Sequence, residues 1–454
     1  MSDNVATSTS VPTAGLPTVE EINGWSRDRV KEFLQERRAD LDLEGEDIDK
    51  IYTQRVKGST FLDFTAVDFE RWGVPGSPAK EIEKLISKIK GEQPVAVLPT
   101  KPIGVAINEA KKLFNDHSHD LIKVAKNTYE PYSAFIASDK NKYKESIDKK
   151  NIPVINGRPN LLLHNLPEEG EKGLTDYDSF KKHVAESLPR GDKTIILGTS
   201  GCGKTRLCFE TLCHNFGLYL IAYPYSIGSS DLEESARWTK DNITNKSSKD
   251  AEKIAVQAVI SCVVGRLLLL QHLFDVAEEH NATMVPKSWL FLQLDHIIFR
   301  DLRLIFRDVT DLESVNCCSL IIKGLNDRGI LKEIFPVVYD EAQAHTAYLP
   351  ATFPSAKLNQ DGVRAFFSVV VRSLSRSFEE ISKAIICITG SGLSLLRARD
   401  EISARGKEEP HVPTFNKFGR IETSDELFEL VKSIISLKEE EKEVVLPAID
   451  WLKF

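Results

Sequence analysis

A glycine-rich loop between a strand-like run and a helix-like run constrains the fold of this chain most strongly. Residues 193–197, KTIIL, are β-branched and apolar, and they lead directly into GTSGCGKT at residues 198–205. The helix-forming stretch RLCFETLCHNF follows without a break. A strand, a GxxxxGK[ST] loop and a helix in this order predict a phosphate-binding loop (P-loop) within an α/β layer. The alternative is a glycine turn with a purely structural role.

The chemistry of the loop residues assigns each a role at a bound phosphate. Glycines let the backbone curl, so that successive N–H groups and the start of the helix face an anion. Lys204 would reach the β- and γ-phosphates, and Thr205 would offer its hydroxyl to Mg²⁺. At Cys202 we prefer a neutral filler to a thiol activated by the helix dipole. The predicted cofactor-binding residues are Gly198, Thr199, Ser200, Gly201, Cys202, Gly203, Lys204 and Thr205.

A second acidic position follows another apolar run, IFPVVYDE at residues 334–341. Pro336 is tolerable there because it lies near the beginning of the run. Asp340 is the candidate acid that anchors magnesium together with Thr205, as in a Walker B strand. Glu341 is placed to act as the general base toward water. Paired acids favour hydrolysis, whereas a charged strand end before a helix is the alternative interpretation.

The N-terminal part, residues 19–92, has a different pattern. Apolar residues recur at helical spacing in short pieces, each bounded by a cap or breaker such as Ser26, Thr65-x-x-Asp68 or Gly73-Val-Pro-Gly76. The pattern predicts a small all-α bundle. The string VKGSTFLDFTAVDFERWGVPGSPAKEIEKLISKI, with DRVKEFL upstream, resembles the sterile-alpha-motif (SAM) domain. The resemblance implies a module that binds other proteins or itself, and a minority of such domains bind RNA.

The segments GTSGCGKTRL, VVYDEAQ and ITGSGLSL, in this order, resemble the P-loop NTPase module of Crinkler-type proteins of fungi and oomycetes. The resemblance spans residues 192–396. It implies a STAND/AAA-like ATPase with a mostly parallel sheet that uses ATP and Mg²⁺. Such modules usually precede a nuclease-like or kinase-like domain, and the proteins often act as effectors in host nuclei. ATP is favoured over GTP because no guanine-specifying motif stands in a strand context.

The same resemblance suggests further site residues. In STAND and AAA ATPases a polar residue ends the strand after the Walker B strand and contacts the γ-phosphate or positions the water. Here AIICIT at residues 384–389 makes Thr389 the first choice for this catalytic role and Ser391 the second. Arg372 and Arg376 could stabilise transition-state charge, and a solvent-facing helix explains them equally well.

The chain departs from the Crinkler pattern in two places. The SAM-like bundle replaces the usual ubiquitin-like header, and residues 401–454 carry no nuclease or kinase motif. We therefore expect five parts: a tail at 1–18, the SAM-like domain at 19–92, a linker with a helical segment at 93–150, the NTPase at 151–400, and a helical extension at 401–454. The extension would be a shortened lid, a truncation, or the end of an ATPase-only variant.

Composition excludes several other classes. The 454 residues are 41% hydrophobic and 28% charged, which is typical of a globular chain of two or three domains. A net charge of −8 gives no general basic field, so nucleic-acid binding is unsupported except locally. The apolar run at residues 259–270 contains Arg266 and is too short to span a bilayer, which predicts a buried helix and no membrane partner.

The cysteines and the N-terminus concern localisation. Seven cysteines without zinc-like spacing favour a reducing compartment, and the first residues do not form a conventional signal peptide. We expect an intracellular protein, cytoplasmic or nuclear, and secretion as an effector follows only from the Crinkler resemblance. The leading functional hypothesis is an ATP-hydrolysing switch whose SAM-like domain selects a partner or gathers copies. The alternatives are a scaffold that binds nucleotide structurally and an effector with nucleic-acid activity.

Overall fold

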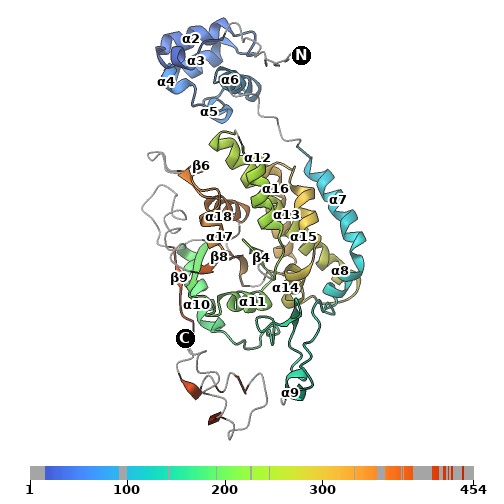
Figure 1. Ribbon diagram of the computed structural model, residues 1–454. Coiled ribbons are helices and arrows are strands. Elements are labelled where there is room, and N and C mark those ends of the chain that lie inside the picture. The colour runs from blue at the N-terminus through green and yellow to red at the C-terminus, as the bar shows by residue number, and fades with distance from the viewer. Residues whose placement is uncertain are drawn as a thin grey trace, which may run out of the picture. The chain divides into compact units, whose positions relative to one another are not determined.

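The structure, a computed structural model, divides the chain into two compact units, Met1–Pro99 and Thr100–Phe454 (Figure 1). It describes residues 16–90, 100–141, 144–190, 192–224, 227–244, 246–331, 333–354, 363–379, 381, 383–391 and 412–418, and isolated positions between 423 and 443. The two units are described separately below.

The first unit is a bundle of short helices. Its predicted helix starts are confirmed: the Ser26 hydroxyl accepts the Arg29 N–H at 3.2 Å, and Thr65 and Asp68 form a reciprocal capping box. Gly58 is required by close packing, because a Cβ there would lie 1.7 Å from the carbonyl oxygen of Ile22. The helices are α1 (Val19–Asn23), α2 (Arg27–Glu36), α3 (Gly45–Thr53), α4 (Gly58–Phe61), α5 (Ala66–Arg71) and α6 (Gly76–Ile89).

The second unit is built on a parallel sheet with the strand order β4-β5-β8-β3-β9. Because these strands all run in the same direction, their carboxyl ends meet at one edge, where ligands bind in open α/β sheets. The strands are β3 (Lys193–Gly198), β4 (Leu218–Ile221), β5 (Phe335–Asp340), β8 (Ala384–Ser391) and β9 (Thr414–Phe415).

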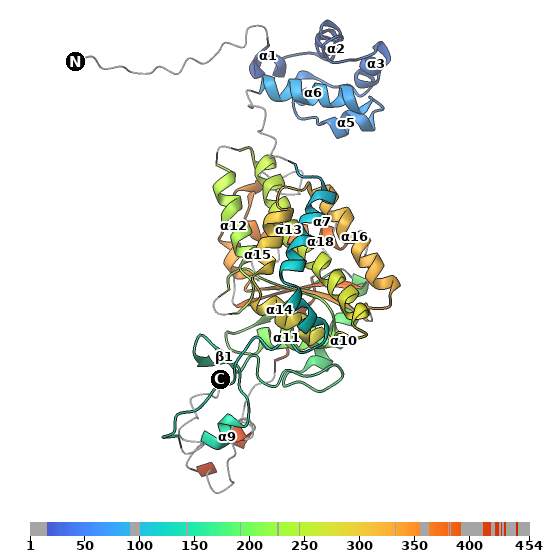
Figure 2. The same ribbon diagram turned by 90° about the vertical axis from the view of Figure 1, so that its right-hand side faces the viewer.

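Helices cover both faces of this sheet, as Figure 2 shows. Side chains alternate between the faces, so that Val337 and Tyr339 of β5 join one core cluster and Val338 joins the other. On the first face lie α12 (Asp231–Asn242), α13 (Ser248–Glu279), α15 (Ile298–Phe306), α16 (Asp311–Asp327) and α18 (Phe366–Ser377). On the second lie α10 (Tyr177–Ser187), which continues into the 3-10 turn Leu188–Arg190, and α11 (Lys204–His214). Helix α14 (Pro286–Asp295) contributes side chains to both clusters.

Helix α13 contains the most apolar run of the chain. By length and composition it could cross a membrane, yet 83% of its most apolar window is buried inside the unit. Arg266 in its middle is also buried and donates to Asp231 of α12, with Nη2 and Oδ1 2.9 Å apart. The prediction of a buried helix is confirmed.

The segment expected to link the domains contributes to the second core. Helices α7 (Ile103–Asp116) and α8 (Ser118–Ala125) bury Ala110, Phe114 and Leu121 against the cluster around α13. The predicted helical segment of the linker is therefore part of the second unit, because its apolar stripes are continuous with that core. The remaining short elements are α9 (Lys144–Asp148), β1 (Val154–Ile155), β2 (Arg158–Pro159), α17 (Gln343–Thr346), β6 (Phe353–Pro354) and β7 (Val363–Arg364).

Two of the expected parts fall largely outside the described residues. Most of the tail at 1–18 and most of the extension at 401–454 are not described. The described residues 412–418 of the extension supply β9, which pairs with β3 through Ile195 and Thr414 and through Ile196 and Phe415. This part of the extension therefore adds a strand to the sheet next to β3, the strand that leads into the glycine-rich loop.

Candidate functional site

The glycine-rich loop leaves the carboxyl end of β3 and turns into helix α11. Gly201 and Gly203 have backbone φ angles of +82° and +96°, which residues other than glycine rarely adopt. Gly198 faces Cys202, since a Cβ at Gly198 would lie 2.4 Å from the Cys202 sulfur. Cys202 thus fills space within the loop. Helix α11 begins at Lys204 and has no side-chain N-cap bond, so its first N–H groups face the loop.

The Lys204 ammonium lies inside this loop. Its Nζ donates to the carbonyl oxygens of Gly198 and Thr199 at 2.9 and 2.6 Å, and it lies 3.8 Å from the Cys202 sulfur. Only 8% of Lys204 is exposed. The loop therefore encloses a positive charge, which is the electrostatic requirement for holding an anion.

Thr205 and Asp340 come into direct contact although 135 positions separate them in the chain. The Thr205 hydroxyl donates to Asp340 Oδ2 at 3.0 Å. This contact joins the start of α11 to the carboxyl end of β5. Because the hydroxyl proton is used by Asp340, the lone pairs of the Thr205 oxygen remain available to a cation.

Asp340 is a deeply buried carboxylate, with 1% of the residue exposed. Besides Thr205, it accepts the Tyr219 phenol on Oδ2 at 2.9 Å and the Glu341 backbone N–H on Oδ1 at 2.8 Å. Burial raises the pKa of Asp340, and these hydrogen bonds offset that effect only in part. Within the described part of the chain, the hydrogen-bond donors to the Asp340 carboxylate are these three neutral groups.

Glu341 directly follows Asp340 and has an unusual backbone conformation. Its φ of +52° is in the left-handed region, which is strained for a glutamate. Its carboxylate accepts the side-chain amide of Gln343. This turn directs the chain away from the sheet immediately after β5, and it leaves Glu341 partly exposed at the site.

Thr389 lies near the carboxyl end of β8, next to Asp340. The register pairs Tyr339 with Ile388, so the next residues, Asp340 and Thr389, lie on neighbouring strands at the same edge. Thr389 is fully buried, and its hydroxyl has no hydrogen-bond partner within the described part of the chain. An unsatisfied buried hydroxyl costs about 1–3 kcal/mol. Ser391, the second choice, is the last residue of β8, and its side chain is outside the description.

The two candidate arginines of α18 pair with the helical layer in this structure. Arg372 Nη1 lies 2.6 Å from Glu252 of α13, and Arg376 Nη1 lies 2.5 Å from Asp311 of α16. These pairs give both side chains a structural role apart from the loop.

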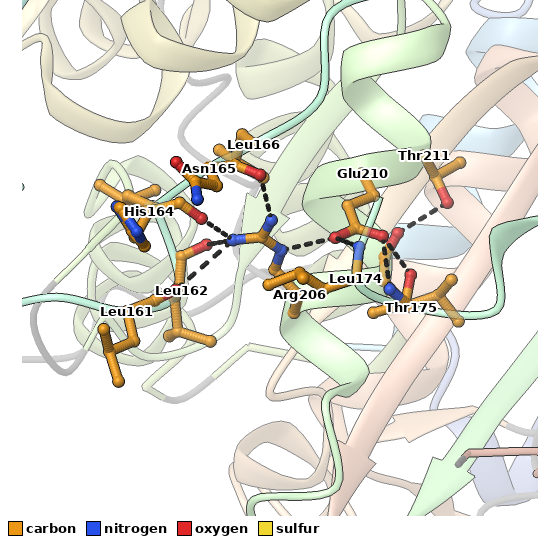
Figure 3. A network of polar contacts seen from close by, with 12 residues as sticks. Leu161, Leu162, His164, Asn165, Leu166, Leu174, Thr175, Arg206, Glu210 and Thr211 are labelled. Atoms are coloured by element: carbon orange, nitrogen blue, oxygen red, sulfur yellow. Dashed lines mark hydrogen bonds and ion pairs between the residues drawn. The ribbon is translucent and has the colours of Figure 1, made fainter. Parts of the chain in front are cut away.

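Sequence reasoning missed Arg206, which directly follows Thr205 and anchors a distant segment (Figure 3). Its guanidinium donates to the carbonyl oxygens of Leu162, His164 and Asn165 at 3.0, 2.5 and 2.7 Å. It also pairs with Glu210 one turn later, with Nε and Oε1 2.6 Å apart. The available signal is the i,i+4 spacing of an arginine and a glutamate in α11.

Glu210 holds the other end of the same segment. Its carboxylate accepts the backbone N–H groups of Leu174 and Thr175 at 2.8 and 3.0 Å, and also the Thr175 hydroxyl. Burial raises the pKa of Glu210, but hydrogen bonds from Thr175 and Arg206 outweigh it and leave the pKa below its usual value. Residues 161–175 are thereby fastened to α11, the helix that starts at the glycine-rich loop.

Comparisons with known proteins bear on the N-terminal unit alone. A family model described as a SAM-like domain matches residues 1–88. The chain therefore has an N-terminal helical SAM-like domain, followed by an α/β region with a parallel sheet. Such a domain is consistent with binding to other proteins or to itself. No curated protein and no solved structure matches the chain significantly.

Proposed function

We propose that the second unit is a Mg²⁺-dependent P-loop ATPase of the STAND/AAA-like type, and that it acts as a switch for the SAM-like domain. The observation that carries the proposal is the meeting of three strand ends at one sheet edge. The enclosed Lys204 follows β3, and Asp340 ends β5 and contacts Thr205. Thr389 lies near the carboxyl end of β8, which runs between these two strands. The resemblance to Crinkler NTPase modules is part of the same proposal.

The residues present suit magnesium in particular. Thr205 and Asp340 offer hydroxyl and carboxylate oxygens, the donor type that this hard cation prefers. In the described part of the chain, no three His, Cys, Asp or Glu side chains gather to hold a metal by themselves. A cation bound here would depend on phosphate oxygens, as Mg²⁺ does in nucleotide sites. Its positive charge would compensate Asp340 and the phosphate oxygens.

The remaining chemistry falls to the protein. Lys204 and the N–H groups at the start of α11 bind and orient the phosphates. Glu341 accepts a proton from the attacking water, and its contact with Gln343 sets the position of the carboxylate before water arrives. The unpartnered Thr389 hydroxyl is available to hold that water or a γ-phosphate oxygen.

Phosphate release from the full chain is the direct test. Wild type is compared with Lys204→Ala, which removes the phosphate-binding charge, and Glu341→Gln, which keeps the shape but removes the base. We expect Lys204→Ala to lose ATP binding and Glu341→Gln to bind ATP while losing hydrolysis by about 100-fold or more. Equal, background release from all three chains would refute the ATPase.

A scaffold remains the second candidate, because the SAM-like match suggests protein interaction without any catalysis. It predicts that wild type binds ATP and releases no phosphate above either variant. Self-association is tested by sizing residues 16–90, which have a core of their own. A monomer at high concentration would exclude assembly through this domain alone.

A further inference from the structure

Tyr219 lies in the middle of β4, and its phenol reaches the carboxylate of Asp340 on the adjacent strand. The register pairs Tyr219 with Val338, so Asp340 is the diagonal neighbour two residues along the same face. The phenol donates to Asp340 Oδ2 at 2.9 Å, and 1% of Tyr219 is exposed. This contact is a buried hydrogen bond between a neutral donor and the acid of the proposed metal site.

Other contacts fix Tyr219 in place. Its ring packs edge-on against Phe209 of α11, with the ring centroids 5.3 Å apart. Its backbone N–H donates to the side chain of Gln293 on α14 at 2.8 Å, and Gln293 in turn donates to the Gly217 carbonyl at 3.2 Å. Helix α14 thus holds the backbone of Tyr219, and Phe209 of α11 packs against the ring that carries the phenol.

The contacts form a chain from Tyr219 to Asp340 and from Asp340 to Thr205. Both hydroxyls share Oδ2, so the position of that oxygen determines where the Thr205 hydroxyl proton points. When the proton points to Asp340, the Thr205 oxygen presents its lone pairs elsewhere. Loss of the phenol would free Oδ2 to shift, and the Thr205 hydroxyl would lose its fixed orientation.

We propose that Tyr219 is a positioning residue for magnesium, acting through Asp340 on the Thr205 hydroxyl. The inference rests on the proposed function, since it presumes Mg²⁺-nucleotide at this loop. Partners that orient metal ligands from outside the coordination sphere typically change metal affinity 10–100-fold when removed. The competing explanation is that a buried phenol simply needs an acceptor, which would make Tyr219 important for stability alone.

Tyr339 supplies a matched control. It is the residue before Asp340, is fully buried, and its side chain lies on the opposite face of the sheet. Its phenol shares a 2.7 Å hydrogen bond with His345 Nδ1 and does not touch the site carboxylates. Tyr219→Phe and Tyr339→Phe thus remove the same atom from equally buried positions on neighbouring strands.

The experiment titrates Mg²⁺ against binding of a fluorescent ATP analogue to the full-length chain, with thermal unfolding recorded for each variant. For Tyr219→Phe we expect unchanged binding in EDTA and a 10–100-fold rise in the Mg²⁺ concentration for half-maximal enhancement. For Tyr339→Phe we expect the wild-type Mg²⁺ requirement, even where unfolding occurs at lower temperature.

Two results overturn the inference and differ from each other. If wild type responds to Mg²⁺ and the two variants require equal Mg²⁺, Tyr219 has only a structural role, and the proposed function survives. If wild type binds no ATP analogue, or binds it equally with and without Mg²⁺, the proposed magnesium site is wrong and the inference falls with it.

Discussion

Replacing Arg206 by methionine tests whether the buried pair with Glu210 holds residues 161–175 to α11. The side chains of Arg206 and Glu210 are 7% and 0% exposed. The variant leaves the Glu210 carboxylate buried without its cation and removes the donor from the carbonyls of His164 and Asn165. Breaking one partner of a buried pair costs about 3–5 kcal/mol. That is a large share of the 5–15 kcal/mol typical of a folded protein.

Hydrogen exchange measured by mass spectrometry localises the effect, and urea unfolding measures its total. A loss of about 3–5 kcal/mol corresponds to a hundredfold or greater acceleration of exchange in peptides from residues 161–175. The control is Arg237→Met, which breaks the i,i+4 ion pair between Arg237 and Glu233. The side chain of Arg237 is 64% exposed, so this pair lies at the surface. We expect no measurable change there. The reasoning would be refuted if Arg206→Met and Arg237→Met had the same exchange rates in residues 161–175 and the same free energy of unfolding.

Two further predictions concern pH and the loop. His345 is buried and neutral, with its pKa lowered to about 3 by burial. Below pH 6.5 only the unfolded chain takes up this proton, so the free energy of unfolding should fall by about 1.4 kcal/mol per pH unit as pH decreases from 6 to 4. In urea unfolding at each pH, His345→Gln should flatten this slope, and an unchanged slope would contradict the assignment. Gly203→Ala, at φ +96°, should lose about 1–3 kcal/mol of stability and weaken binding of the ATP analogue, whereas wild-type binding would exclude a need for this conformation.

Much of the candidate site follows from local sequence. Three features each follow an apolar run: the glycine-rich loop, the acids Asp340 and Glu341, and Thr389 of β8. Parallel strands bring such ends to one edge, so the expected neighbours of Asp340 could be named in advance. The starts of α2 and α5 were predictable for the same reason, because Ser26 and Thr65 act within one turn of the chain.

The contacts that were missed depend on pairing across the fold. In the sequence LYLI, Tyr219 has the pattern of a buried strand residue, and nothing there indicates a polar contact. The register of β4 with β5 brings its phenol to Asp340. The targets of Arg206 are backbone carbonyls, which have no sequence signature. The sequence of residues 93–150 predicts a linker with a helical segment, and only the packing against α13 shows that α7 and α8 belong to the second core.

Consecutive residues at the start of α11 connect the local and the distant contacts. Thr205 contacts Asp340 at the sheet edge, and Arg206 binds the carbonyls of residues 161–165. One helical turn therefore cannot rotate or shift to accommodate a ligand at Thr205 without changing the geometry at Arg206. Since a buried arginine with several acceptors tolerates little displacement, residues 161–175 limit how far the loop helix can move. In the proposed ATPase this constraint favours a preorganised loop, in which phosphates displace the contacts of Lys204 and leave the helix in place.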